Sequence, residues 1–300
     1  MTFPPPEPDV PAGETARGTI DLRYEDVSQD GRVVLTALPQ AAGVVWRRLA
    51  KSPFPARIRD AGIVPLLTRL HLAGGDGPVS VRQPVDVRGT YQLAHTRAAD
   101  GAVDRIVLLI WVEATAPKGR THGPQPPDEG TVVTVGRVFA EHVFTRPFAP
   151  PERRKVLGFS IPGMPEVPAA RYEWRPSAQI LALPDDARWR DADAQPDPAP
   201  LVFGLDHTDS NQHVNSLVYP RLFLDAALRR LADLGKPAAR LARAVEVGYR
   251  KPCFAGDRAR WLVRAFESQD SEGAVGTLVP EGAAGDAARP HCHARIVFGE

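Results

Sequence analysis

The chain has 300 residues, more than one hydrophobic core usually needs, so its length allows one large domain or two packed halves. Lysine and arginine number 37 and aspartate and glutamate 36, so the chain has no excess of positive charge that would attract nucleic acid. The only cysteines, Cys253 and Cys292, are too few for a disulfide framework or a four-cysteine zinc site, which indicates a reducing compartment.

The N-terminal segment, residues 1–17, is rich in proline, glutamate and glycine and has no apolar periodicity. Such a segment buries too little apolar surface to offset the entropy of ordering, so we expect a disordered arm. It also lacks the basic and apolar regions of a secretory signal, and no later stretch is apolar for long enough to cross a bilayer. We therefore expect a cytoplasmic protein with neither a membrane nor a nucleic-acid partner.

Two stretches have the apolar periodicity of a helix. The first is Leu35–Lys51, and the second is Asn215–Gly235, in which leucines recur at helical spacing. Asn215 is a suitable N-cap, and Gly235 is a suitable C-terminal stop. Pro220 is tolerated only within the first turn, which agrees with a helix that starts near Asn215.

Most of the remaining pattern favours β-strands. Arg105–Glu113 is a continuous apolar run with β-branched and aromatic residues, which is typical of a strand covered on both faces. The other stretches expected to form strands are Thr131–Phe144, Arg171–Leu183, Ala244–Arg250, Arg258–Glu267 and His291–Phe298. A long helix accompanied by strands occurs twice, so the sequence predicts an α+β protein in which each half wraps a curved antiparallel sheet around a long central helix.

The two halves resemble diverged copies of each other. The segment that starts at residue 25 aligns with the segment that starts at residue 206, with a proline of each predicted helix in register. In this alignment Ser28 stands where Asp209 does, and Arg32 stands where His213 does. One half would then keep the chemistry, while the other completes the core.

Polar side chains gather immediately before the second predicted helix, where Asp209, Asn211, His213 and Asn215 occupy alternating positions. A helix N-terminus provides free backbone N–H groups and a partial positive field, which can stabilise the oxyanion that forms when a carbonyl is attacked. A nearby carboxylate can act as nucleophile or activate water, while histidine and asparagine orient the reacting groups. The structural alternative is an ordinary Asp-Ser-Asn turn whose side chains bond their own backbone.

The segment DSNQHVN at 209–215, followed by Tyr219, resembles the D-x-N-x-H-V-N motif of acyl-ACP thioesterases, which are double-hotdog proteins. Residues 249–257 resemble the next strand and turn of the same domain. The resemblance implies an N-terminal hotdog-like unit with a degenerate site at 18–165 and a C-terminal hotdog unit that carries the motif at 166–300.

The same resemblance implies that Asp209, Asn211 and His213 are catalytic in the hydrolysis of acyl thioesters of acyl carrier protein or coenzyme A. This is an activity of fatty acid metabolism, and it needs neither a metal nor an organic cofactor. Asn215 is expected to be a structural cap rather than a catalyst. The acyl chain length, the head group, the carrier and the formation of a homo-oligomer remain open.

One position departs from the motif of the family, whose members usually carry glutamate where this chain has Pro252. Glu246 and Asp257 are the nearest carboxylates in sequence, and neither is assigned to that role. The departure leaves open a catalytically reduced acyl-binding or pathway-partner protein. A third alternative is a dehydratase or isomerase on the same scaffold, with His213 as the base.

Three other features have ordinary interpretations. His291 and His293 have no further ligand at a recognisable spacing, so we expect no metal there. Cys253 lies at the end of a predicted strand, which favours a buried structural thiol over a reactive thiolate. The basic residues at 153–155 read as a solvated loop, and their functional alternative is a contact for an acidic carrier protein or for the phosphates of coenzyme A.

Overall fold

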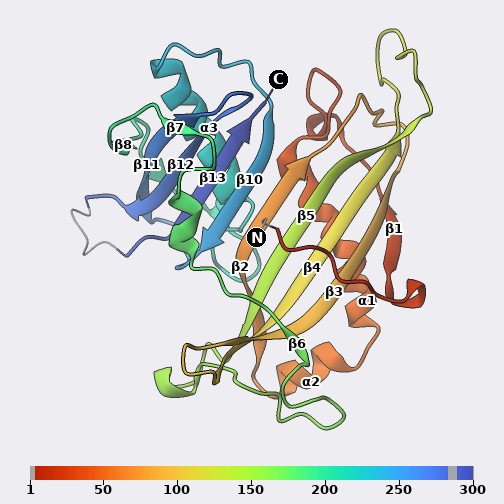
Figure 1. Cartoon of the computed structure of the whole chain (residues 1–300), viewed down its shortest axis with the longest axis vertical. Coiled ribbons are helices and arrows are strands. Elements are labelled where there is room, and N and C mark those ends of the chain that lie inside the picture. Colours follow the sequence, from red (N-terminus) through yellow and green to blue (C-terminus); the bar gives the residue numbers. More distant parts are fainter. Residues whose placement is uncertain (1–3, 283–288, 300) are drawn as a thin grey trace. The chain divides into compact units, whose positions relative to one another are not determined.

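The computed structural model describes residues 4–282 and 289–299, and the chain divides into two compact units. Unit 1 comprises Met1–Val33, Ala37–Leu70 and Gly75–Arg175, and unit 2 comprises Val34–Thr36, His71–Gly74 and Pro176–Glu300. Each unit contains antiparallel strands and few helices (Figure 1). This agrees with the predicted α+β class.

The sheet of unit 1 runs in the order β1, β3, β4, β5, and β2 follows β5. These strands are β1 (Ala16–Ile20), β2 (Val64–Gly74), β3 (Val85–Arg97), β4 (Val103–Pro117) and β5 (Val132–Thr145). The last four residues of β2 belong to unit 2. β4 pairs antiparallel with both β3 and β5, and its residues 106–112 are all buried. The apolar run predicted to be a doubly covered strand is therefore confirmed.

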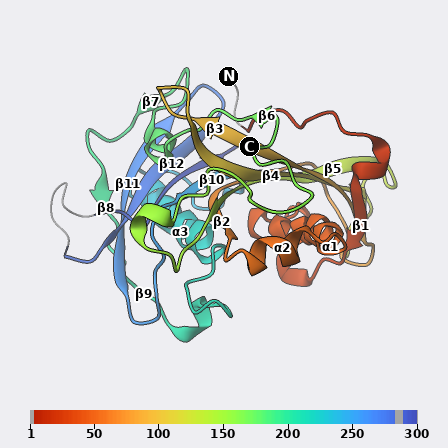
Figure 2. The ribbon, with the colours of Figure 1, turned by 90° about the horizontal axis from the view of Figure 1, so that it is seen from below.

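The first predicted helix is not one continuous α-helix. Residues Leu35–Ala42 form a 3-10 helix (η3) that contains Pro39, and the α-helix α1 (Gly43–Ala50) follows it. Proline has no N–H to donate inside an α-helix, and so the regular helix begins only after it. Figure 2 shows α1 and α2 (Phe54–Asp60) on one side of the sheet of β3, β4 and β5.

The described part of the N-terminal arm contacts the sheet, contrary to the expected disorder. Glu7 accepts hydrogen bonds from Arg88 Nη1 and Thr90 Oγ1, both at 2.9 Å, and the carbonyl of Pro5 accepts one from Trp111 Nε1 at 2.9 Å. Composition alone missed these contacts because the partners lie on β3 and β4, far away in sequence. Residues 1–3 lie outside the described part of the chain.

The sheet of unit 2 runs in the order β10, β13, β12, β11. These strands are β10 (Ala242–Tyr249), β11 (Arg258–Glu267), β12 (Glu272–Pro280) and β13 (Cys292–Phe298). The three strands predicted here are confirmed, while β12 was not predicted. The short strands β7 (Arg188–Trp189), β8 (Gln195–Pro196) and β9 (Leu201–Val202) pair with the remaining edge of β11.

The strand predicted at Arg171–Leu183 is wrong. Only β6 (Ala170–Arg171) is extended and paired, and the 3-10 helix η5 (Ser177–Leu181) follows. Pro176 is the residue before η5, where a fixed φ favours the start of a helical turn.

The long helix of unit 2, α3 (Val218–Asp233), packs against the sheet (Figure 2). Phe223 is fully buried, and its ring lies 4.7 Å from that of Trp261 on β11. The C-terminal stop at Gly235 is confirmed. Its φ is 75°, its N–H donates to Ala232 O at 2.9 Å, and Lys236 N donates to Leu231 O at 3.0 Å, which together form a Schellman motif.

Two aspartates tie the segment between β7 and β9 to α3. Asp197 accepts hydrogen bonds from Arg229 at 2.7 and 2.9 Å, and Asp191 binds Arg230. Asp191 Oδ2 also accepts from the backbone N of Ala265 on β11 at 2.7 Å. Both aspartates are buried, so the two ion pairs and the backbone contact fix the segment across the helix and the strand.

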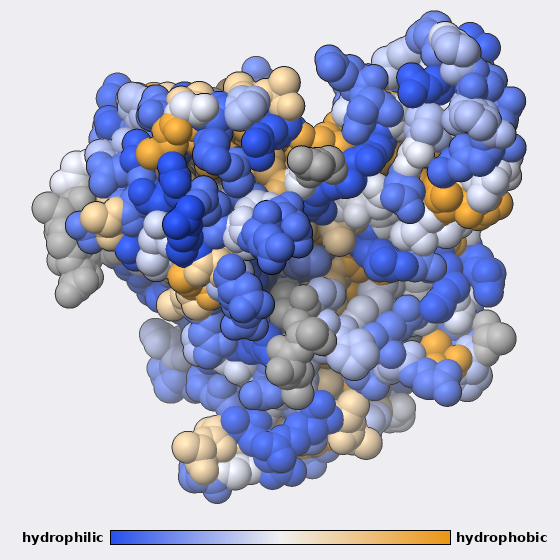
Figure 3. Space-filling view, turned by 45° about the horizontal axis from the view of Figure 1, so that its top comes forward, coloured by the Kyte–Doolittle hydropathy of each residue, from blue (hydrophilic) through white to orange (hydrophobic). Residues whose placement is uncertain are grey.

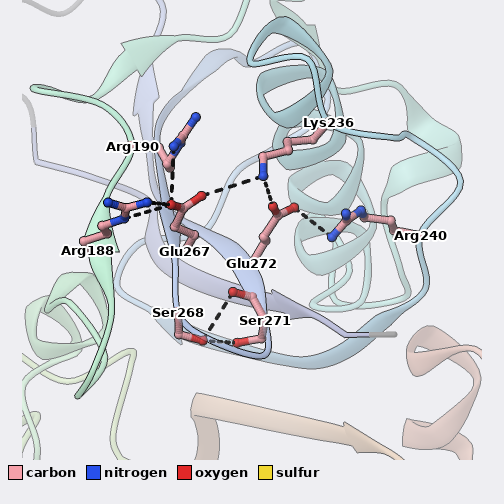
Figure 4. A network of polar contacts seen from close by, with 8 residues as sticks. All are labelled: Arg188, Arg190, Lys236, Arg240, Glu267, Ser268, Ser271 and Glu272. Atoms are coloured by element: carbon pink, nitrogen blue, oxygen red, sulfur yellow. Dashed lines mark hydrogen bonds and ion pairs between the residues drawn. The ribbon is translucent and has the colours of Figure 1, made fainter.

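A second charge network joins the end of α3 to the hairpin of β11 and β12 (Figure 4). Glu272 pairs with Lys236 and with Arg240 Nη1, the latter at 2.7 Å. Glu267 accepts from Arg188 Nε at 2.8 Å, and this hydrogen bond is the main reason why the pKa of Glu267 is lowered. Exposed pairs of this kind contribute little individually.

No helix within residues 4–282 and 289–299 is long and apolar enough to cross a membrane. On the face of the molecule drawn in Figure 3, hydrophilic residues predominate and hydrophobic residues form small separate groups.

Candidate functional site

The three predicted catalytic residues lie on one tight turn of unit 2, directly before α3. The backbone N of Asp209 donates to His213 O at 3.1 Å, and Gln212 N donates to Asp209 O at 2.9 Å. An isolated bridge between Thr208 and Val214 closes the base of the turn. Gln212 has a φ of 63°, in the left-handed region that a tight turn requires. The backbone therefore fixes the spacing between Asp209 and His213.

Asn211 and Asn215 both donate hydrogen bonds to the half-buried carboxylate of Asp209. The backbone N of Asn211 donates to Oδ1 at 2.9 Å, and the Nδ2 of Asn215 donates to Oδ2 at 3.3 Å. This satisfies the structural interpretation of an aspartate turn and still leaves lone pairs on both oxygens for a further donor.

The side chain of Asn215 is not the N-cap that was predicted, because α3 begins at Val218. Its Oδ1 accepts from Leu217 N at 2.9 Å, and its backbone carbonyl accepts from Val218 N at 3.0 Å. These two amides are therefore engaged and do not serve as the expected oxyanion donors. What the start of the helix still provides is its partial positive field.

His213 and Asn211 project into solvent beside the turn. The ring of His213 meets the ring of Phe254 at a centroid distance of 5.2 Å and an interplanar angle of 73°. In the part of the chain that the structure describes, neither ring nitrogen of His213 has a hydrogen-bond partner, and the carboxylate of Asp209 does not bind it. Both ring nitrogens are thus free to meet a substrate.

Two tyrosines that were not predicted to belong to the site make hydrogen bonds that support the turn. The hydroxyl of Tyr249 donates to Ser216 O at 2.8 Å, and the hydroxyl of Tyr219 accepts from Cys253 N at 3.0 Å. Burial raises the pKa of both phenols, so both remain neutral. Tyr249 lies at the end of β10. The sequence signal that could have identified it is its place as the first residue of 249–257, the segment that resembles the next strand and turn of the same domain.

Pro252 stands where the motif of acyl-ACP thioesterases usually has glutamate, and the two carboxylates nearest in sequence both have partners. Glu246 is buried on β10 and pairs with Arg295 Nη2 at 2.8 Å. Asp257 Oδ2 accepts from Phe254 N at 2.9 Å and so stabilises its own turn. Each carboxylate thus has a structural contact of its own.

Cys253 is fully buried, and burial raises its pKa to about 11, so it is a neutral thiol at physiological pH. His291 and His293 are also buried. Their Nδ1 atoms lie 3.3 Å from Pro252 O and 3.2 Å from Thr277 Oγ1, respectively. Within the described ranges, no three histidine, cysteine, aspartate or glutamate residues are placed to hold a metal ion.

Unit 1 contains a turn with the same backbone hydrogen bonds. Ser28 N donates to Arg32 O and Gly31 N donates to Ser28 O, both at 2.9 Å, and a bridge joins Val27 to Val33. Gly31 has a φ of 87°, as Gln212 has a left-handed φ in the other turn. We call residues 27–33 the counterpart turn. At the place of the Asp209 carboxylate it carries a serine hydroxyl.

No family model matches the chain, and no curated protein matches its sequence. Solved structures do resemble it. An acyl-ACP thioesterase from Bacteroides thetaiotaomicron has a TM-score of 0.59 and 15% identity, over 95% of this chain and 98% of that one. A putative oleoyl thioesterase from Lactobacillus plantarum has a TM-score of 0.57 and 13% identity, over 95% of this chain and 96% of that one. A 12:0-ACP thioesterase from Umbellularia californica has a TM-score of 0.57 and 15% identity, over 97% and 99%.

Proposed function

From the fold that this chain shares with acyl-ACP thioesterases, we propose that it hydrolyses acyl thioesters of acyl carrier protein or coenzyme A at the turn that carries Asp209, Asn211 and His213. The observation that carries the proposal is the turn itself. It holds a half-buried carboxylate and an exposed imidazole at a fixed spacing before α3.

In the proposed reaction, the carboxylate of Asp209 removes a proton from water as the water oxygen bonds to the thioester carbonyl carbon. The C–S bond then breaks, the thiolate leaves, and the proton passes to the departing sulfur. His213 and Asn211 bind the carbonyl oxygen and the water through their free polar atoms. The field at the start of α3 stabilises the negative charge that develops on the carbonyl oxygen.

A second candidate function is acyl binding without efficient turnover. It is favoured by Pro252 at the position of the family's glutamate, together with the structural contacts of Glu246 and Asp257. With one acidic group fewer, the carboxylate of Asp209 would have to activate water alone.

The test is the release of free thiol from a panel of short, medium, long and aromatic acyl-CoA and acyl-ACP substrates. Asp209→Asn should lower the rate by about 100-fold or more, which is the usual contribution of a general base. Asp206→Asn, at an exposed aspartate three residues earlier, is the matched control and should retain the wild-type rate.

Equal rates in the two variants would exclude Asp209 from the reaction. Acyl-CoA binding without thiol release would favour the acyl-binding protein. Formation or hydration of a double bond with the thioester intact would indicate the dehydratase or isomerase instead.

A further inference from the structure

A cleft of about 190 Å³ lies in unit 1 beside the counterpart turn, and the proposed thioesterase does not use it. Its lining comes from three segments, at residues 24–31, 79–81 and 120–122. The counterpart turn of unit 1 thus forms part of a cleft that is large enough for a small ligand.

Backbone contacts hold the three segments together. Val79 N donates to Gly31 O at 2.8 Å, and an isolated bridge joins Val79 to Lys118. Val81 N donates to Thr121 Oγ1 at 3.0 Å. Gln125 binds the backbone of Arg120 twice, at 2.7 and 3.1 Å. The cleft is therefore formed before any ligand arrives, which lowers the entropic cost of binding.

The cleft has a flat aromatic wall and an apolar floor. The rings of Tyr24 and His122 are stacked, with centroids 5.9 Å apart and an interplanar angle of 13°. Tyr24 is 66% exposed, an unusual exposure for a large aromatic side chain. Valines at 27, 79 and 81 contribute aliphatic surface to the lining. This combination favours a planar, apolar ligand.

The residues that line the cleft carry one formal charge, and it is positive. Its lining segments contain three acidic residues, Glu25, Asp26 and Asp30, and each is paired with an arginine of the same stretch, Arg23 or Arg32.

Arg120 also lines the cleft. Within the described residues no hydrogen bond or ion pair engages its guanidinium group. A planar guanidinium pairs best with a carboxylate, which it can bind through two parallel hydrogen bonds.

We propose that this cleft binds a single-ring aromatic carboxylate, with the ring against Tyr24 and His122 and the carboxylate on Arg120. The volume of about 190 Å³ is below the roughly 300 Å³ at which pockets for drug-sized ligands begin, so it suits one substituted ring rather than a whole nucleotide. This site is independent of the proposed thioester chemistry.

The experiment is isothermal titration of the full chain with four probes. Benzoate tests the whole proposal. Benzamide has the same shape without the charge, cyclohexanecarboxylate has the charge without the flat ring, and adenosine monophosphate is the nucleotide alternative. Benzoate should bind at least tenfold more tightly than each of the other three.

Two variants test the contact with the carboxylate and the contact with the ring separately. Arg120→Gln should weaken benzoate binding by about tenfold or more, as expected for the loss of a hydrogen bond between charged groups. Tyr24→Leu should remove the preference for benzoate over cyclohexanecarboxylate. Arg153→Gln, at an exposed arginine elsewhere in unit 1, is the control and should leave the affinity unchanged.

Three results would overturn the proposal. The first is the absence of benzoate binding to the wild-type chain at any concentration tested. The second is equal affinity in Arg120→Gln and wild type. The third is tighter binding of adenosine monophosphate than of benzoate, which would assign the cleft to nucleotides.

Discussion

Asn215 donates from its Nδ2 to the Oδ2 of Asp209 over 3.3 Å, and its own Oδ1 accepts from the backbone of Leu217 at 2.9 Å. One side chain therefore joins the candidate catalytic carboxylate to the backbone that leads into α3. The direction in which the carboxylate faces depends on the start of the helix.

Replacing Asn215 with alanine should lower both stability and activity. The change removes two half-buried hydrogen bonds, so the free energy of unfolding should fall by about 1–2 kcal/mol, measured by urea denaturation. The kcat for thioester hydrolysis should fall more than KM changes, because Asp209 loses the donor that orients it. Ser210→Ala, at an exposed neighbour, is the control, and an equal kcat in the two variants would contradict this orienting role.

Replacing Tyr249 with phenylalanine removes the 2.8 Å hydrogen bond to Ser216 O and leaves the ring packing unchanged. We expect a loss of about 1 kcal/mol in the free energy of unfolding, because the carbonyl keeps partial access to water. Amide hydrogen exchange should become faster at residues 215–218 and remain unchanged in β11 and β12. Uniform acceleration across unit 2 would indicate a general loss of stability instead.

Replacing Asp191 with alanine should destabilise unit 2 by about 2 kcal/mol, since the backbone N of Ala265 loses its buried acceptor and Arg230 loses its buried ion-pair partner. Chemical denaturation is the measurement. Asp193→Ala lies in the same segment at an exposed position and serves as the matched control. If both variants unfold at the same denaturant concentration, the ion pair does not hold the segment.

His142 makes unit 1 sensitive to acid. It is buried on β5 with its ring perpendicular to that of Trp46 and the two centroids 5.2 Å apart, and burial lowers its pKa to about 4 from an ordinary 6.5. Between these values the unfolded chain binds a proton that the folded chain does not, so stability falls as the pH decreases from 6.5 to 4, by up to roughly 3 kcal/mol.

The variant His142→Phe should remove this contribution and make the free energy of unfolding less dependent on pH over that range. A part of the dependence should remain, because burial also lowers the pKa of His293 to about 4. His122→Phe, at an exposed histidine, is the control. A dependence in His142→Phe as steep as that of the wild type would assign the acid sensitivity to other groups.

The regular elements were the most predictable part of the fold. Residues 106–112 are all apolar, which is typical of a strand covered on both faces, and β4 is buried over this run. The first helix is broken because Pro39 lies inside it, and the α-helix begins only after this residue. The contacts of the N-terminal arm depend on Arg88 and Trp111, which no local pattern connects to residues 4–7.

The turn at the candidate site was predictable from the sequence, and its hydrogen bonds were not. The alternation of Asp209, Asn211 and His213 identified the turn, but which atoms bond depends on the left-handed backbone at Gln212. The role of Tyr249 depends on how β10 packs beneath the turn. The spacing of residues along the chain contains no information about either.

The three short strands along β11 have a consequence for the behaviour of the protein in concentrated solution. Without β7, β8 and β9, the backbone N–H and C=O groups of β11 would form an unpaired edge, a template on which strands of other molecules can assemble. The three short strands cover that edge, and loops interrupt them, so none is long enough to extend the sheet to another molecule. Asp191 and Asp197 anchor the segment that contains them. Loosening them should therefore produce aggregation before it produces unfolding.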